Sequence, residues 1–460
     1  NQVRNSSYFS KLFLKNNQLQ NMNMKKPSPK KEKKPSIMIR HRDRDIILDT
    51  FVMDGKPWYY IYHRKDGTVQ YEDESYSLHW ADYMPLEPQS TYIKNQCLIF
   101  PSDLAPYENI EALLGEISQY VYRYCDVTPV FGRIVPYFVL LTYLYEDFYE
   151  IPYLRVIWDY GSGKSRFLRV VWNICYNPII ANGGTSLSSL FRMIEISKWT
   201  LVLDEADFQF SDTTNEIIKL LNNGFAKGNP ILRADGDNFE PRAYDVYCPK
   251  IIGGRFEFRD KATESRCINE VMKRTQRTDI PLNLTETFDR ESESLRNKLY
   301  QFRYDYQGKI AIQEERITWL EWRLNQILNP ILSIIKSIGK KEDYENIIAY
   351  FQWRQKEIRE ERKFSIEGMI FAIIQEKESK NFPNVYYSHI LADLKDMDTS
   401  SQMNPRKLWS LLKQHEIKTL RRNDGFVIPI RENRLELDRI YKQYDLQSPL
   451  KTEEVDLVFS

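Results

Sequence analysis

The feature that most constrains the fold is a short motif near residue 160, Gly161-Ser-Gly-Lys-Ser165. Val156 and Ile157 precede it as a strand-forming run, and apolar residues at helical spacing follow it. Glycines between a strand and a helix let backbone N–H groups converge on an anion at the helix N-terminus. A lysine here reaches the β- and γ-phosphates of a nucleotide, and a serine hydroxyl ligates Mg²⁺. The motif therefore predicts an α/β fold with a phosphate-binding loop. The residues predicted to bind nucleotide are Asp159, Tyr160, Gly161, Ser162, Gly163, Lys164, Ser165 and Arg166.

The motif is incomplete, because Trp158 stands where the full phosphate-loop pattern has its first glycine. A Gly-x-Gly-Lys-Ser sequence also occurs by chance, and a loop that no longer binds nucleotide could retain the same residues. A second motif at a suitable spacing is needed to choose between a working site and a vestigial one.

Asp204-Glu205 is that second motif, because it follows the apolar run at 200–203 and lies 40 residues after Lys164. Ligands of open α/β sheets bind where the carboxyl ends of the parallel strands meet. Phosphoryl transfer needs one carboxylate to hold Mg²⁺ and another to orient or deprotonate the attacking water. A solvated acidic turn would explain Asp204 and Glu205 alone, but together with the phosphate loop they predict a nucleotide site.

Composition limits the class of protein in which this site can lie. The net charge is only +1, so any affinity for nucleic acid must come from local patches. The five cysteines form no Cys-x-x-Cys pair, which fits reduced thiols in a cytoplasmic protein. No apolar run reaches the length of a membrane span. The chain begins with Asn1, so we expect it to be a fragment of something longer.

Shifts in composition predict six segments. Residues 1–36 are a lysine- and proline-rich linker, expected to be disordered and either a tether or a DNA contact. Residues 37–103 form a small β-rich domain with a hairpin at Asp66-Gly67, whose tyrosines are core residues or stack on bases. Residues 104–280 alternate strands and helices after two leading helices, and a hairpin is expected around 235–238.

The second half of the chain is mainly helical. Residues 281–362 form an extension with helices at about 285–306, 312–338 and 341–360, the second broken at Pro330. Residues 363–445 have three helices and then a β-hairpin, the order of a winged helix, and 446–460 are a tail. Basic residues gather in 404–431, which fits contact with DNA phosphates, although winged helices also bind proteins. The candidates for DNA contact here are Arg406, Lys407, Lys418, Arg421 and Arg422.

With these motifs in order, residues 105–275 resemble the ATPase domain of replicative helicase-like proteins of phages, plasmids and other mobile elements. These are P-loop ATPases of the AAA+ type, distantly similar to minichromosome maintenance helicases. The matching stretches are Pro152-Tyr-Leu-Arg-Val, Gly161-Ser-Gly-Lys-Ser165, Thr200-Leu-Val-Leu-Asp-Glu-Ala-Asp207, Pro249-Lys-Ile-Ile-Gly253 and Lys261-Ala-Thr-Glu-Ser-Arg-Cys267. The implied fold is an AAA+-like core with a β-rich N-terminal domain, a helical extension and a winged helix.

The resemblance also implies roles for individual residues. Lys164 contacts the phosphates of ATP, Ser165 and Asp204 hold Mg²⁺, and Glu205 activates water. Arg266 takes the place of an arginine finger for a neighbouring subunit, the alternative being a surface ion pair with Glu264 or Glu270. Where relatives have a polar sensor residue, this chain has Gly253 and Gly254. The substitute is either Arg255 or a residue elsewhere in the chain. The hairpin residues Arg233, Asn238 and Arg242 are candidates for DNA translocation, and a surface loop is the alternative.

The implied function is an ATP-dependent DNA helicase or translocase of a mobile element, a hydrolase that acts in DNA replication as a ring, expected to be a hexamer. Other replication proteins are possible partners. One alternative is a DNA-dependent ATPase switch, such as a loader or transposition regulator, that does not unwind DNA. Another is a non-enzymatic origin-binding scaffold with a vestigial loop.

Overall fold

The computed structural model describes residues 36–37, 40–78, 81–95, 97–158, 163–181, 185–197, 199–204, 212–235, 238–313, 316–397 and 402–446. The chain divides into two compact units, residues 1–103 and 104–460, which are described separately. Within the described ranges, none of the helices combines the length and the apolar character needed to cross a bilayer.

The N-terminal unit consists mainly of antiparallel strands. One sheet has the order β2-β3-β4-β5, from Arg40–Arg42, Ile46–Met53, Lys56–His63 and Val69–Glu72. A second sheet has the order β1-β7-β6, from Ser36–Ile37, Ala81–Met84 and Tyr76–Leu78, and α2 spans Thr91–Lys94. The predicted hairpin is confirmed, because β4 and β5 pair around Gly67, which has a φ of 73°. Tyr59 belongs to the buried core with Ile46, Leu48 and Ile61, whereas Tyr71 is exposed.

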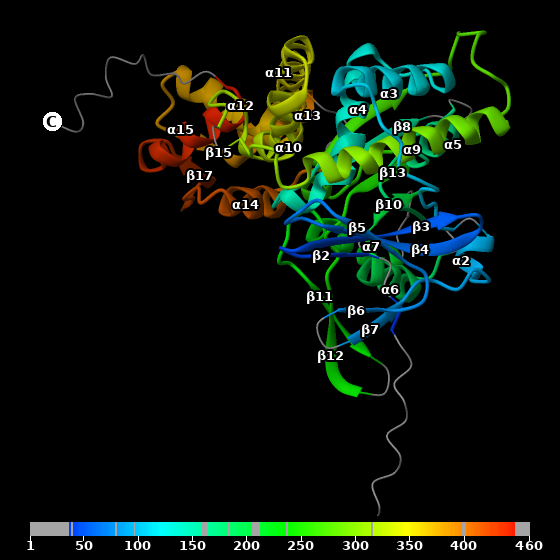
Figure 1. Ribbon diagram of the computed structural model, residues 1–460. Coiled ribbons are helices and arrows are strands. Elements are labelled where there is room, and N and C mark those ends of the chain that lie inside the picture. The colour runs from blue at the N-terminus through cyan, green and yellow to red at the C-terminus, as the bar shows by residue number, and fades with distance from the viewer. Residues whose placement is uncertain are drawn as a thin grey trace, which may run out of the picture. The chain divides into compact units, whose positions relative to one another are not determined.

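The second unit is built around a parallel sheet of five strands, which confirms the predicted α/β fold (Figure 1). The strand order is β14-β8-β13-β10-β9. The strands span Cys267–Met272, Tyr153–Trp158, Lys250–Gly254, Thr200–Leu203 and Pro178–Ala181 in that order. β8, β10 and β13 each have hydrogen-bonded neighbours on both sides, and their near-continuous apolar runs fit such burial. The strand before the phosphate loop, β8, is thus held from both sides.

Helices on this sheet explain why its strands are so apolar. α5, Lys164–Trp172, packs against β8, β10 and β13. α3, α4 and α9 pack on one another, at Ile110–Tyr124, Pro129–Leu144 and Glu286–Tyr306. Aromatic rings join the layers, because Phe131 of α4 lies 5.8 Å from Phe167 of α5, and Tyr143 of α4 lies 5.4 Å from Tyr300 of α9.

The remaining helices of the core are α6, Leu187–Ser197, α7, Asp212–Asn223, and α8, Lys261–Glu264. α7 begins at Asp212 and ends at Asn223. Gly224, directly after α7, has no room for a side chain, because a Cβ there would lie 2.5 Å from Lys250 Nζ and 2.5 Å from the carbonyl oxygen of Val246.

The helical segment after the sheet differs from the prediction in two ways. α10 spans only Trp322–Ile338, and α11 spans Lys341–Lys363. The described residues between 312 and 321 lie outside any helix, with a turn at 318–320. The Asn325 amide donates to the Ile317 carbonyl, and the Asn329 amide donates to that of Gln313. Pro330 lies inside α10 without breaking it, at the cost of the one backbone hydrogen bond that a proline cannot donate.

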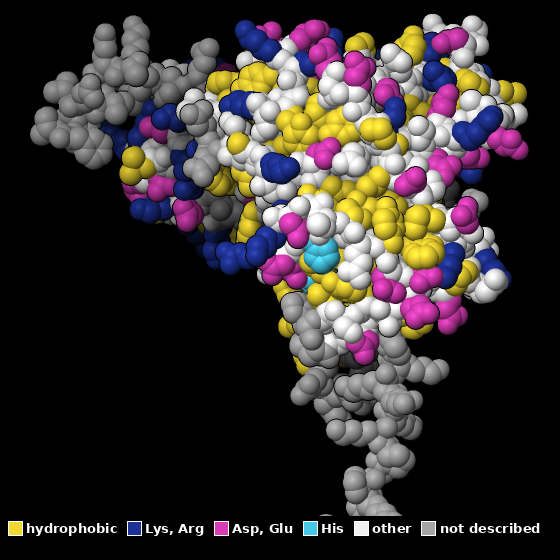
Figure 2. Space-filling view, viewed as in Figure 1, with side chains coloured by type: hydrophobic (Ala, Val, Ile, Leu, Met, Phe, Trp, Pro, Cys, Tyr) yellow, Lys and Arg dark blue, Asp and Glu magenta, His cyan; other side chains and the backbone are white. Residues whose placement is uncertain are grey.

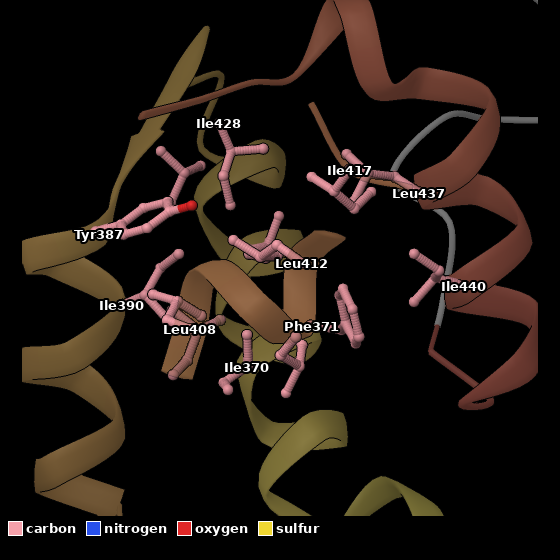
Figure 3. Close-up of a cluster of buried hydrophobic side chains, with 14 of the residues drawn as sticks. Ile370, Phe371, Tyr387, Ile390, Leu408, Leu412, Ile417, Ile428, Leu437 and Ile440 are labelled. Carbon is pink, nitrogen blue, oxygen red and sulfur yellow. The ribbon is translucent and has the colours of Figure 1, made fainter. Parts of the chain in front are cut away.

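The C-terminal segment has the predicted order of three helices followed by a hairpin. Its elements are α12 (Ile366–Ser379), β15 (Asn384–Tyr386), α13 (Tyr387–Met397), α14 (Pro405–Gln414), β16 (Leu420–Arg422), β17 (Gly425–Pro429) and α15 (Arg434–Gln443). Apolar side chains from every helix and from β17 meet in one buried cluster, shown in Figure 3. As predicted, Pro405 opens α14, and the Asn404 side chain accepts from the Lys407 N–H.

Candidate nucleotide-binding site

The N-terminus of α5 has the backbone geometry of a phosphate cradle. Gly163, at the N-cap of α5, has a φ of 87°, a conformation that favours glycine. No side chain caps the helix, and the first intrahelical bond runs from the Phe167 N–H to the Gly163 carbonyl. The N–H groups of the first turn, including those of Lys164 and Ser165, therefore have no acceptor within the helix. Among the described residues, nothing lies within 4 Å of a Cβ built on Gly163.

Part of the predicted site lies outside the described residues. This holds for Asp159, Tyr160, Gly161 and Ser162 of the loop and for Glu205 of the acidic pair. For Lys164 and Trp158 the backbone alone is described. The roles expected for these side chains therefore stay predictions.

Asp204 lies at the same edge of the sheet as the N-terminus of α5. It directly follows β10, and its N–H donates to the Ala181 carbonyl at the end of β9, at 3.0 Å. Neighbouring strands lie about 4.8 Å apart, so the ends of β8 and β10, with β13 between them, are separated by about 10 Å. That gap accommodates a phosphate group and a hydrated ion.

The oxygen donors at this edge suit Mg²⁺, which keeps several of its waters and takes few protein ligands. Ser165 is exposed and Asp204 is half-buried, so a hydroxyl is offered from the first turn of α5 and a carboxylate from the end of β10. Across the described ranges, no group of three or more His, Cys, Asp or Glu residues is placed to hold a metal ion. A magnesium ion here would therefore be held jointly by the protein and the nucleotide.

β13 ends between β8 and β10. Gly253 and Gly254 are buried and pair in register with Val156 and Ile157 of β8. Arg255 follows immediately and is exposed, which keeps it a candidate for the missing polar sensor.

Arg166 is directed away from the predicted phosphate position. Its guanidinium donates to the backbone carbonyls of Pro281 and Leu282, in the segment that follows the sheet. Its side chain therefore ties α5 to this segment, and only its backbone N–H belongs to the first turn of the helix.

Arg266 lies at the opposite edge of the sheet. It directly precedes β14, and its carbonyl accepts from the N–H of Tyr153 at the start of β8, at 3.0 Å. The six residues of β8 separate this edge from the phosphate loop by about 20 Å, farther than an arginine side chain reaches. Arg266 therefore cannot reach the phosphate loop of its own chain.

The alternative ion pairs of Arg266 are not formed in the described part of the chain. Glu264 pairs instead with Arg155, and Glu270 accepts from the Thr128 N–H at 2.7 Å and from its hydroxyl at 2.9 Å. The Arg266 guanidinium donates to the Ala262 carbonyl.

The pair of Arg155 and Glu264 was not anticipated from the sequence. Arg155, in the middle of β8, is 1% exposed and Glu264 is 7% exposed. The Arg155 guanidinium also stacks on Phe258, 3.9 Å from the ring centroid. Glu264 further accepts from the Phe258 N–H at 2.7 Å and from the Asn269 amide. This buried pair fixes the segment that carries Arg266 to the strand that carries the phosphate loop. An arginine inside an otherwise apolar strand was its only signal.

The predicted hairpin is confirmed as β11, Ile231–Asp235, and β12, Asn238–Tyr244, and it extends away from the central sheet (Figure 1). Arg233 and Arg242 are direct cross-strand partners, an arrangement that places two like charges on one face. Arg233 stacks on Phe191 at 4.5 Å and lies 3.7 Å from a Glu216 carboxylate oxygen. For Asn238 the backbone alone is described.

Basic side chains gather on α14 and on the residues that follow it, up to β16. Arg406, Lys407, Lys418, Arg421 and Arg422 are all exposed, and Figure 2 shows Lys and Arg side chains grouped around the position of α14. Two exposed aromatic rings lie among them, because Lys413 lies over Trp409 at 4.9 Å and Arg421 lies over Phe426 at 6.0 Å. Cations next to exposed rings match the chemistry of nucleic-acid surfaces.

Comparison with known proteins gives only distant structural matches. No protein-family profile and no curated protein matches the chain. Two apo structures of the NrS-1 C-terminal region, residues 305–718, share 11% and 12% identity with it, at TM-scores of 0.38 and 0.39. Each alignment covers 83% of this chain and 96% of the other. An X-ray structure of JCV helicase shares 11% identity at a TM-score of 0.27, over 48% of this chain and 59% of the other.

Proposed function

We propose that this chain is an ATP-dependent DNA helicase or translocase of a mobile element, with an AAA+-like core that works as a ring in DNA replication. The observation that carries the proposal is the uncapped N-terminus of α5 at the end of β8, with Asp204 on the same edge of the sheet. A glycine at positive φ, a helix dipole and a carboxylate at this spacing suit a nucleotide triphosphate with Mg²⁺.

In this proposal the phosphates of ATP lie against the first turn of α5, where the free N–H groups point at them. Lys164 neutralises the β- and γ-phosphates, and Ser165 and Asp204 hold Mg²⁺, which withdraws charge from the phosphate oxygens. Glu205 orients the attacking water and accepts its proton. Arg255, next to the buried glycines of β13, senses the terminal phosphate.

Arg266 completes the site of the neighbouring subunit. Its position at the far edge of the sheet supports this role, because such a residue serves only a nucleotide held by another copy. An arginine fork offers two parallel hydrogen bonds to phosphate oxygens and stabilises charge in the transition state. The assembly is therefore a ring, expected to be a hexamer, in the cytoplasm.

Two basic surfaces contact DNA in this proposal. The β11–β12 hairpin offers Arg233, Asn238 and Arg242, and the facing arginines gain from a phosphate between them. The winged helix contributes exposed cations from α14, from β16 and from the loop between them, namely Arg406, Lys407, Lys418, Arg421 and Arg422. The domain divisions expected from the sequence assign these surfaces to residues 104–280 and 363–445.

The test is strand displacement on forked DNA with ATP and Mg²⁺, comparing the wild type with Lys164→Ala. Displacement by the wild type alone supports the helicase. DNA-stimulated hydrolysis without displacement would instead identify a loader or transposition regulator. Equal, negligible turnover in both proteins would favour a scaffold with a vestigial loop, for which Trp158 is the motive.

A further inference from the structure

We propose that an acidic segment of this chain, residues 453–459, docks on the basic face of α14 and the adjoining hairpin and there competes with DNA. The segment reads Glu-Glu-Val-Asp-Leu-Val-Phe, so it combines three carboxylates with four apolar side chains. Its docking depends only on the chain's own surface, whereas the competition rests on the DNA contact of the proposed function. Under this proposal the chain carries its own occupant for that surface.

α14 presents a stripe of cationic and aromatic side chains to solvent. Arg406, Trp409 and Lys413 are spaced three and four residues apart, which places them on one face of the helix. All three are exposed, and the Lys413 ammonium lies 4.9 Å from the centroid of the Trp409 ring. On the hairpin, Arg421 lies 6.0 Å from the centroid of the exposed Phe426 ring. Exposed rings beside cations suit a peptide that has both carboxylates and apolar side chains.

The carboxylates nearest in sequence to these cations are engaged elsewhere. Residues 404–431 contain two acidic residues, Glu416 and Asp424. Glu416 pairs with Arg439 at 3.4 Å, and Asp424 accepts from the Tyr386 hydroxyl at 3.4 Å. The cations of the stripe and the hairpin therefore form no ion pair with these two residues, and three carboxylates from the acidic segment would supply complementary charge.

The chain returns to α14 after α15. The ring centroid of Tyr444 lies 6.3 Å from that of His415, the residue that caps the C-terminal end of α14. Leu446 packs against the buried cluster that includes Leu412 of α14, a cluster shown in Figure 3. The Leu446 N–H also donates to the Tyr441 carbonyl at 2.8 Å. The residues after Leu446 therefore begin close to one end of the proposed docking face.

The length of chain between Leu446 and the acidic segment suits this face. α14 has ten residues and is therefore about 15 Å long. Six residues, 447–452, precede Glu453, and six residues span at most about 20 Å. Glu453 can therefore reach either end of α14. A connection this short gives a local concentration on the order of millimolar, so a weak contact suffices for docking.

The first test measures DNA affinity in the full chain by fluorescence anisotropy of a labelled single strand. Leu457→Ser/Phe459→Ser keeps every charge of the acidic segment but removes apolar contacts. We expect this variant to bind DNA about tenfold more tightly than the wild type, because a millimolar local concentration and a dissociation constant of about 0.1 mM block the surface by that factor. Long-range repulsion of DNA by the carboxylates would be the same in both proteins, so it cannot produce this gain.

Charge variants give the matched comparison. Glu453→Gln/Glu454→Gln/Asp456→Asn should also tighten DNA binding, by about tenfold or more. The control Glu345→Gln/Glu360→Gln/Glu361→Gln changes the net charge equally by neutralising three exposed carboxylates of α11. The DNA affinity of the control should stay within about twofold of the wild type, because salt screens charges outside the docking face.

The second test locates the acidic segment directly. A photoreactive benzoylphenylalanine in place of Phe459 should cross-link to residues 405–426 on illumination, and Arg406→Gln/Lys413→Gln should reduce the yield of that product. Mass spectrometry of an equal mixture of isotopically heavy and light chains then identifies the source of the segment. Cross-linked peptides of a single isotope show docking on the same chain, whereas mixed peptides show docking on a second copy.

Cross-links of a single isotope within 405–426, together with the gain in DNA affinity, would support the proposal. Wild-type affinity in Leu457→Ser/Phe459→Ser, cross-links elsewhere, or mixed heavy and light products would overturn it while leaving the ATPase proposal standing. If the cross-link forms within 405–426 but no variant binds DNA, docking is supported, and both the competition and the proposed DNA contact are overturned.

Discussion

Removal of the buried arginine of β8 should destabilise the nucleotide-binding core strongly. In Arg155→Met, Glu264 remains 7% exposed and loses its cationic partner. Breaking one side of a buried ion pair costs about 3–5 kcal/mol, because the remaining charge stays desolvated. The Phe258 N–H and the Asn269 amide still donate to Glu264, so we expect a value near the lower limit.

The double variant Arg155→Met/Glu264→Gln tests this reasoning. Glutamine keeps an oxygen that can accept from the Phe258 N–H and leaves no buried charge. The expected cost therefore falls to about 1–2 kcal/mol, the value of imperfectly replaced hydrogen bonds. The double variant should thus be more stable than the single variant Arg155→Met.

Native-state hydrogen exchange at the amides of β8 and β14 over a urea series measures the local free energy of opening. The matched control is Lys261→Met, which breaks the ion pair between Lys261 and Glu257. Because these two side chains are 75% and 40% exposed, the substitution should lower the free energy of unfolding by less than about 0.5 kcal/mol. A cost below about 1 kcal/mol for Arg155→Met, or a double variant less stable than the single, would refute the stranded-charge argument.

Four further predictions follow from single positions. Gly163→Ala should weaken ATP-analogue binding in fluorescence titrations and cost about 1–2 kcal/mol, because a side chain is strained at a φ of 87°. Gly224→Ala should lower the Tm, at a cost of about 1–3 kcal/mol, because the new methyl group would meet the buried Lys250 amine; an unchanged Tm would contradict the close packing. Burial opposes ionisation of Asp260, but hydrogen bonds from Thr263 and Asn222 hold its pKa below 3.8 in the folded protein. The ionised Asp260 therefore stabilises the fold above pH 3.8, and this stabilisation is lost as the pH falls through the pKa of the folded state. In an acid titration of stability, Asp260→Asn should lack this loss. Arg421→Ala should reduce the salt dependence of DNA binding by about 0.9 in the slope of log K against log salt, whereas an unaltered slope would remove this residue from the phosphate contacts.

Local patterns predicted much of the fold. The alternation of apolar strands with helices around the phosphate loop predicted a parallel sheet. The hairpin at 235–238 and the C-terminal order of three helices and a hairpin were also present. The strand order was not predictable, because it depends on how the crossovers pack. It places β13 between the loop strand and Asp204, which local pattern cannot show.

Other errors arose where side chains bind distant backbone. Residues 312–321 have a helical composition, but the described ones lie outside any helix, and Asn325 and Asn329 bind the carbonyls of Ile317 and Gln313. Pro330 was expected to break its helix, yet packing tolerates the missing hydrogen bond. The roles of individual site residues remain predictions, because geometry places Gly163, Ser165 and Asp204 at one edge without testing their chemistry.

Under the role proposed for Arg266, each subunit has a head and a tail. The N-terminus of α5 lies at the carboxyl edge of the sheet and Arg266 lies at the amino edge, so in that proposal no subunit holds a complete site alone. A two-fold dimer brings identical surfaces together, and only head-to-tail contact joins unlike edges. An open filament of n subunits then has n − 1 composite sites, and a closed ring has n. Turnover per subunit should therefore vanish on dilution and rise with concentration until the ring closes.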